Sequence, residues 1–89
     1  MDVEILVLTS DNCVPCKALT KEMKDRGILF REIGPDHDKS IEYRDAYGLM
    51  GSPITIIKSE YDIKFIHGNG KKTMEKILAI ARKHKLYVN

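Results

Sequence analysis

The sequence predicts an α/β fold in which a four-stranded mixed sheet is flanked by helices, with the element order βαβαββα. In the first half of the chain, short aliphatic runs alternate with amphipathic segments. In the second half, two apolar runs are separated by a short polar turn, and an amphipathic segment follows them. A βαβ unit makes parallel strand pairs and a hairpin makes antiparallel ones. We therefore expect both kinds of pairing in one sheet.

The first half contains the predicted βαβ unit. Residues 3–8 are mostly β-branched and aliphatic, which is typical of a strand covered on both faces. A helix is expected over 14–26, and Gly27 is placed to end it. A second strand is expected over 28–33, and the turn formers and charges at 34–39 predict a solvated loop.

The second half begins with a short predicted helix. Ser40 is the expected N-cap of this helix, which covers 41–47 and ends at Gly48. Beyond Pro53 the pattern predicts a strand, a polar hairpin loop, a second strand and a last helix, at 54–57, 58–62, 63–66 and 73–85.

Length and composition indicate one small globular domain covering residues 1–89. The hydrophobic fraction is 43% and the charged fraction is 31%, as in soluble proteins. The net charge of +2 argues against a nucleic-acid or membrane surface as partner. No apolar run approaches the roughly 20 residues of a membrane span, and acidic residues near the start are unlike a signal peptide. We expect a cytoplasmic, reducing setting.

The two cysteines, Cys13 and Cys16, form a C-x-x-C pair between the first strand and the first helix. Backbone N–H groups at a helix N-terminus lack intrahelical partners and carry a partial positive charge. A thiolate at that position is stabilised, so the thiol pKa falls and the sulfur becomes a nucleophile near neutral pH. Two cysteines alone are not a disulfide framework. The pair predicts thiol chemistry.

Helical spacing assigns a role to each sulfur. With Cys13 as the N-cap, Pro15 lies in the first turn, where its missing N–H costs little, and the Cys16 N–H points back to the Cys13 sulfur. Cys16 also begins a stripe at i, i+3, i+4 and i+7 that continues with Leu19, Thr20 and Met23. We therefore predict that Cys13 is the attacking thiolate and Cys16 the sheltered resolving thiol.

Charges beside the pair are expected to tune the pKa of Cys13. Lys17 favours the thiolate and Asp11 opposes it; the sequence leaves their net effect open, and the helix terminus is expected to outweigh it. The competing interpretation of the pair is half of a metal site. Zinc usually requires four ligands, and the remaining candidates, His37, His67 and His84, lack the paired spacing. We expect no bound metal or cofactor, only a reversible Cys13–Cys16 disulfide.

Three segments resemble the thioredoxin-fold family, and the similarity covers essentially the whole chain. They are the motif Cys13-Val14-Pro15-Cys16 after a strand, the segment 47–57 around Ser52-Pro53, and the glycine turn at 68–70. The resemblance implies a thioredoxin-like fold with a cis Ser52–Pro53 bond beside Cys13. It also implies that Ser52 offers main-chain contacts to an extended substrate. The residues assigned to substrate binding are Val14, Pro15, Ser52 and Pro53.

Details of the motif favour thioredoxins over glutaredoxins. Proline is second between the cysteines, as in thioredoxins, and Lys71-Lys72 replaces the acidic residue with which glutaredoxins usually hold the amino group of glutathione. Two departures concern thioredoxins themselves. Val7 stands in place of their usual buried acid, so proton transfer at Cys16 must differ, and Asn12 stands in place of the usual Trp.

The resemblance implies a small monomeric carrier that reduces protein disulfides, with thioredoxin reductase or glutathione as the electron source. A role as hydrogen donor to ribonucleotide reductase is one expectation from it. Two alternatives stay open at this point. One is a glutathione-dependent glutaredoxin. The other is a binding module with a bridging metal or an iron–sulfur site.

Overall fold

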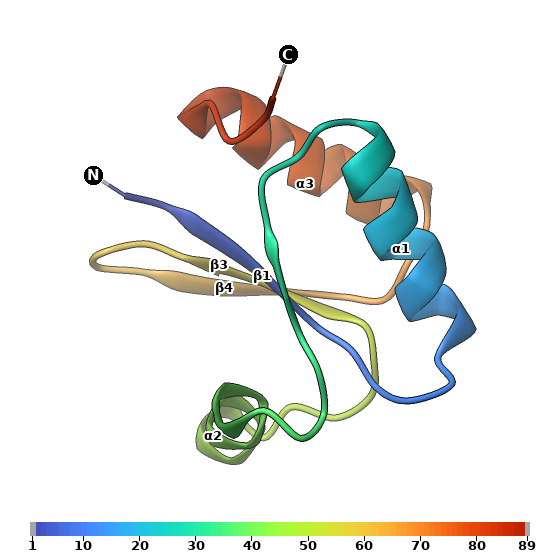
Figure 1. Ribbon diagram of the computed structural model, residues 1–89. Helices are drawn as coiled ribbons and strands as arrows, with labels where there is room; N and C mark the ends of the chain where they lie inside the picture. The colour runs from blue at the N-terminus through green and yellow to red at the C-terminus, as the bar shows by residue number, and fades with distance from the viewer. Residues whose placement is uncertain (1, 89) are drawn as a thin grey trace.

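The computed structural model describes residues 2–88 and has the predicted element order (Figure 1). The elements are β1 (Glu4–Leu8), α1 (Val14–Asp25), β2 (Arg31–Ile33), α2 (Asp38–Tyr47), β3 (Ile54–Lys58), β4 (Ile63–His67) and α3 (Lys71–His84). The four strands form one sheet in the order β2-β1-β3-β4. Strand β1 pairs in parallel with β2, and the β1–β3 and β3–β4 pairs are antiparallel. The expectation of a mixed sheet is confirmed.

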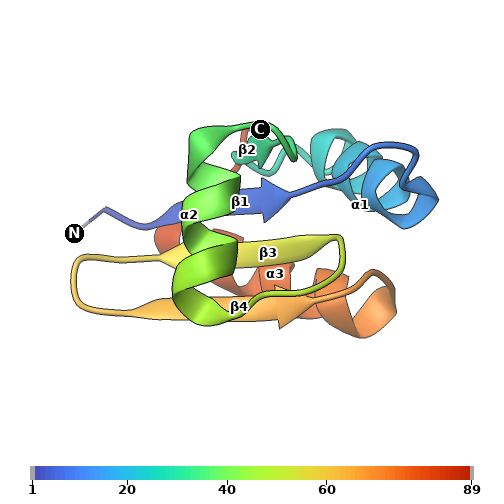
Figure 2. The same ribbon diagram turned by 90° about the horizontal axis from the view of Figure 1, so that it is seen from below.

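The strand register places four connections at one end of the sheet, one of them leading from β2 to α2, since Ile33 at the end of β2 lies opposite Leu8. Leu8, the last residue of β1, lies opposite Ile54, the first residue of β3, which in turn lies opposite His67 at the end of β4. The chain therefore leaves β1 for α1, enters β3, and leaves β4 for α3 at this same end (Figures 1 and 2). We call this end the active-site end, because it holds the cysteine pair.

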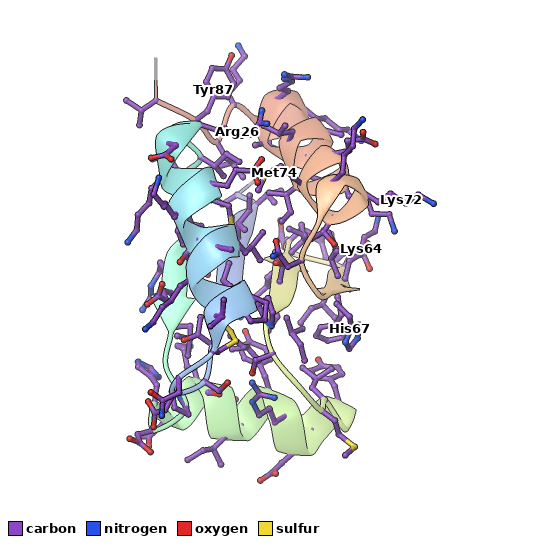
Figure 3. All side chains as sticks on the ribbon, turned by 90° about the vertical axis from the view of Figure 1, so that its right-hand side faces the viewer. Arg26, Lys64, His67, Lys72, Met74 and Tyr87 are labelled. Carbon is purple, nitrogen blue, oxygen red and sulfur yellow. A yellow bond between two sulfur atoms is a disulfide. The ribbon has the colours of Figure 1, made fainter. Side chains whose placement is uncertain are left out.

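Helices cover both faces of the sheet. Helices α1 and α3 lie on one face, and α2 alone covers the other (Figures 1 and 2). Alternate side chains of β1 point to the two faces of the sheet. Because helices cover both faces, the strand is apolar on both sides. Ile5 and Val7 enter the core under α1 and α3, whereas Leu6 and Leu8 enter the core under α2. Met74 of α3 lies between α3 and α1 and closes the first core (Figure 3).

The second strand is shorter than predicted. Only Arg31–Ile33 pairs with β1, whereas the expected strand began at Ile28. The backbone of residues 27–29 instead pairs with the C-terminal segment, where the Leu29 N–H donates to the Leu86 carbonyl at 2.8 Å. Local composition favours an extended backbone over the whole of 28–33, but the first part of this segment pairs with the far end of the chain and not with β1.

The start of α2 also differs from the expectation. Helix α2 begins at Asp38, and its N-cap is His37, whose Nδ1 accepts the Lys39 N–H at 3.1 Å. An unprotonated ring nitrogen satisfies a free helix donor as a hydroxyl does. Ser40, the predicted cap, lies inside the helix and is fully buried. The predicted ending at Gly48 is confirmed, since this glycine takes the left-handed conformation with φ 62°.

Helix α3 is two residues longer at its start than predicted and ends one residue earlier. It begins at Lys71 after Gly70, and Lys85 is its left-handed C-cap. Its inward face holds Met74, Ile77 and Ala81, as the spacing predicted, and Thr73 is buried in its first turn. No helix within residues 2–88 has both the length and the apolar character required to cross a membrane.

Candidate active site

The cysteine pair forms the N-terminus of α1. Cys13 is the N-cap, in an extended conformation with φ −97° and ψ 100°, and its Sγ accepts the Cys16 N–H at 3.1 Å. Its carbonyl accepts the Lys17 N–H at 3.1 Å, which is the first bond of the helix. Pro15 lies in the first turn, where its missing N–H leaves no bond unmade. The predicted capping geometry is confirmed.

The two sulfurs are joined in a disulfide but differ in access to solvent. Cys16 is 3% exposed, Cys13 is half-buried, and Val14 between them is 75% exposed. Cys16 starts the buried stripe of α1 that continues through Leu19, Thr20 and Met23, as predicted. An incoming sulfur can therefore approach Cys13 from outside, whereas Cys16 can be reached only from within the protein.

Asn12 sets the direction in which the chain enters the helix. Its φ of 55° lies in the left-handed region, which asparagine tolerates better than most residues with a side chain. This is one of two non-glycine residues with positive φ among those described. Asn12 stands where thioredoxins usually have tryptophan, and the left-handed backbone conformation supplies a reason for asparagine at this position.

The segment entering β3 lies beside the cysteine segment. Ser52–Pro53 is a cis peptide bond, as the resemblance implied, and Pro53 is buried. The Pro53 carbonyl accepts the Gly68 N–H at 2.9 Å, which ties this segment to the end of β4. Because β1 and β3 are adjacent strands that meet at the active-site end, Pro53 and Cys13 belong to neighbouring connections (Figure 1).

The backbone of Ser52 is unpaired among the described residues. Within residues 2–88, neither its N–H nor its carbonyl forms a hydrogen bond. Met50 in the same loop is 84% exposed, and Val14 is exposed on the cysteine segment. Unpaired backbone groups next to exposed apolar side chains are suited to an extended peptide, which offers complementary backbone groups and side chains.

Arg44 is a residue of this site that sequence reasoning missed. It lies in α2, yet its guanidinium donates to the Gly51 carbonyl at 2.8 Å and to the Ser52 Oγ at 3.0 Å. Its Nε donates to the Oγ of buried Ser40 at 3.3 Å. The i, i+4 spacing of Ser40 and Arg44 was visible in the sequence, but nothing in it indicated that α2 approaches the loop before Pro53.

The charged residues predicted to tune Cys13 are exposed. Within the part of the chain described, the side chains of Lys17 and Asp11 form no hydrogen bond or ion pair, and their effect on Cys13 stays a prediction. Lys71 and Lys72 begin α3 at the active-site end, and Lys72 projects into solvent (Figure 3). Lys17, Lys71 and Lys72 are thus all exposed.

The buried interior of residues 2–88 contains no charged side chain. Val7 is fully buried opposite Thr55 of β3, and both side chains face α1 and α3. The buried polar residues of 2–88 are all serine or threonine, and the hydroxyl of Thr55 has no hydrogen-bond partner among them. An acid or base for Cys16 is therefore not supplied by this described interior, which agrees with the expectation from Val7.

The histidines are not arranged around the cysteines. His37 caps α2, His67 ends β4 and His84 ends α3. Within residues 2–88, no three side chains of His, Cys, Asp or Glu are grouped as metal ligands. The cysteine pair would offer only two of the four ligands that a zinc site usually has.

Sequence comparisons match no protein-family model and no curated protein. Comparison of structures finds Chlamydomonas reinhardtii thioredoxin f2, at 15% identity and a TM-score of 0.63, covering 97% of this chain and 82% of that one. A Thermus thermophilus thio-disulfide isomerase matches at 15% identity and a TM-score of 0.57, covering 99% and 82%. Trichomonas vaginalis thioredoxin matches at 19% identity and a TM-score of 0.55, and the match covers 91% of this chain and 78% of that one. The chain has the thioredoxin fold, with a C-x-x-C disulfide at the start of α1.

Proposed function

We propose that this protein is a small thiol–disulfide oxidoreductase that reduces disulfides in other proteins. The observation that carries the proposal is the asymmetry of the Cys13–Cys16 disulfide at the N-terminus of α1. Cys13 is partly exposed and its sulfur accepts a hydrogen bond from the Cys16 N–H, whereas the side chain of Cys16 is buried. Such a site has an attacking sulfur and an internal sulfur that completes the reaction.

The reaction begins with the reduced protein. The Cys13 thiolate attacks one sulfur of the partner disulfide, a Cys13–partner bond forms, and the other partner sulfur leaves as a thiolate that takes up a proton. Cys16, having lost its proton, then attacks the Cys13 Sγ and releases the second partner sulfur as a thiol. Two electrons pass to the partner, whose two sulfurs gain one proton equivalent from Cys16 and one from water, and the Cys13–Cys16 disulfide is formed.

The proton of Cys16 is proposed to leave through water or to the departing partner sulfur. Support comes from the uncharged interior of the described residues, where Val7 and Thr55 are buried side by side on adjacent strands. Burial in apolar surroundings disfavours a thiolate, so the second step is expected to depend on how the Cys16 sulfur is solvated.

The proposed substrate is an extended segment of a protein. The free N–H and carbonyl of Ser52 would pair with its backbone, and Val14 and Met50 would contact its side chains. Pro15 and Pro53 shape the two sides of this surface. Lys71 and Lys72 favour a protein over glutathione, because they would repel the amino group of the tripeptide.

The proposed electron source is thioredoxin reductase, with glutathione as the alternative donor. We propose that the protein works as a monomer in the cytoplasm, where such reductases keep thiols reduced. Enzymes that form a disulfide in each turnover, ribonucleotide reductase among them, are the proposed recipients. No bound cofactor is required, because the cysteine pair itself carries the electrons.

The test is NADPH consumption with insulin as the disulfide acceptor, in two arms. One arm contains thioredoxin reductase, and the other contains glutathione and glutathione reductase. Turnover in the first arm alone would support the proposal, and turnover in the second alone would identify a glutaredoxin. Absence of turnover in both arms, with zinc or an iron–sulfur chromophore in protein purified under reducing conditions, would favour a binding module.

A further inference from the structure

Arg44 connects α2 to the loop that ends at Pro53. Its guanidinium makes three hydrogen bonds, to the Ser40 Oγ at 3.3 Å, the Gly51 carbonyl at 2.8 Å and the Ser52 Oγ at 3.0 Å. Its backbone carbonyl also accepts the Leu49 N–H at 3.0 Å. One residue thus contacts the loop through both its main chain and its side chain.

The loop is anchored by two buried side chains, Leu49 and Pro53, but the residues between them depend on other contacts. Residues 48–53 are outside helices and strands, and Gly48 and Gly51 have φ values of 62° and 86°. Glycine has more conformational freedom than any other residue, so a loop built on it is held in one shape only by its contacts. Besides Arg44, the described backbone contact is that of Pro53 with Gly68.

The chemistry of arginine fits this task. A guanidinium is planar and presents its donors in a fixed fork, so fixing one nitrogen orients the others. Ser40 is fully buried in α2, and its Oγ accepts a hydrogen bond from the Arg44 Nε–H. The two terminal nitrogens of Arg44 then donate to Gly51 and Ser52. Arg44 forms no ion pair within residues 2–88, so these hydrogen bonds are the contacts that the structure shows for its charge.

We infer that Arg44 is a positioning residue that holds the backbone of Ser52 in place for an extended protein substrate. This inference rests on the proposed function. The Ser52 Oγ is occupied by Arg44, which leaves the N–H and carbonyl of Ser52 for the substrate. A small disulfide that contacts only the Cys13 sulfur would not bind to the backbone groups of Ser52. Arg44 therefore determines how well protein disulfides bind, and leaves the reactivity of the cysteine pair unchanged.

The experiment compares two substrates across four variants. Arg44→Ala, Arg44→Lys and Ser52→Ala are assayed with insulin and with the small aromatic disulfide DTNB, together with wild type. Arg82→Ala is the matched control, because it removes one positive charge from the exposed last turn of α3. Thermal unfolding of each variant establishes that it is folded at the assay temperature.

For Arg44→Ala we expect kcat/KM for insulin to fall about tenfold, mainly through KM, as loss of about 1.4 kcal/mol of binding would produce. The rate with DTNB should stay within about twofold of wild type. Arg44→Lys should recover part of the loss, because an ammonium reaches one acceptor but lacks the fork. Ser52→Ala, which removes one acceptor, should show a smaller rise in KM, and Arg82→Ala none.

Either of two results would overturn this inference and leave the proposed function standing. One is an unchanged KM for insulin in both Arg44→Ala and Ser52→Ala. The other is an equal loss of kcat/KM with insulin and with DTNB. The second result would mean that Arg44 acts on the thiols. Should Arg44→Ala be unfolded, Ser52→Ala and Arg44→Lys carry the same comparison. A wild-type protein that reduced neither disulfide would overturn the proposed function, and this inference with it.

Discussion

The backbone N–H of Cys16 donates to the Sγ of Cys13 at 3.1 Å, so the first turn of α1 and the cysteine pair are one structural unit. The N-cap contact that starts the helix also aims a donor at the sulfur that would carry the thiolate. In the reduced protein a charged sulfur would make this a charge-assisted hydrogen bond, which is stronger than a neutral one. Helix formation and sulfur activation therefore use the same atoms.

Replacing each cysteine separately should give two different outcomes. Cys13→Ser is expected to abolish disulfide reduction, because the exposed attacking sulfur is lost. Cys16→Ser should still attack but cannot resolve, so a covalent complex with insulin should accumulate and be visible by mass spectrometry without reductant. Sustained turnover by Cys16→Ser would contradict the two-cysteine mechanism. Recovery of a covalent complex with Cys13→Ser would reverse the assigned roles.

Thr55→Val should stabilise the protein. The Thr55 hydroxyl is fully buried without a partner among the described residues, and an unsatisfied buried polar group costs about 1–3 kcal/mol. Valine has nearly the same shape, so we expect a gain of about 1 kcal/mol in the free energy of unfolding, measured with urea.

The matched control for this prediction is Thr20→Val. Its hydroxyl is buried too, but it donates to the Cys16 carbonyl at 3.0 Å. Losing that bond should lower the free energy of unfolding by about 0.5–1.5 kcal/mol. Equal effects of the two substitutions would show that the Thr55 hydroxyl is paired in solution.

Gly27→Ala should be strongly destabilising. Gly27 has φ 72°, and a Cβ placed there would lie 2.5 Å from the Val88 carbonyl oxygen, so strain and a clash with the backbone combine. We expect a loss of more than about 2 kcal/mol on urea unfolding, together with release of the C-terminal segment.

Gly34→Ala serves as the comparison for Gly27→Ala. A Cβ at Gly34 would have no heavy atom within 4 Å, and its φ is not in the left-handed region. This substitution should be neutral or stabilising by up to about 1 kcal/mol, because alanine restricts the unfolded chain. A similar loss at both positions would contradict the role given to the Val88 carbonyl.

His37→Ala should weaken α2 by about 1 kcal/mol, since it removes the acceptor of the Lys39 N–H. His37→Asp should restore the stability, because a carboxylate caps the same donors and suits the positive end of the helix. Urea unfolding would measure both variants at neutral pH. An unchanged free energy of unfolding in His37→Ala would contradict the role of His37 as the N-cap of α2.

The sequence by itself determined the element order and the chemistry of the cysteine pair. Both depend on short-range spacing. The distance of three residues between Cys13 and Cys16 sets the cap, and the repeat through Leu19 and Met23 sets the buried stripe. Mixed sheet pairing also followed, because a short hairpin connection permits only antiparallel strands and a βαβ unit makes parallel ones.

The tertiary structure decided what those local rules leave open. Arg44 reaches Ser52 only because α2 packs against the loop before β3, and the Leu29 backbone pairs with Leu86 only because the chain end returns to it. Between His37 and Ser40, both able to cap α2, packing buried the serine and left the histidine at the helix start. In each case the partner is chosen by three-dimensional proximity, which depends on the packing of the whole chain and is not encoded in any single short segment.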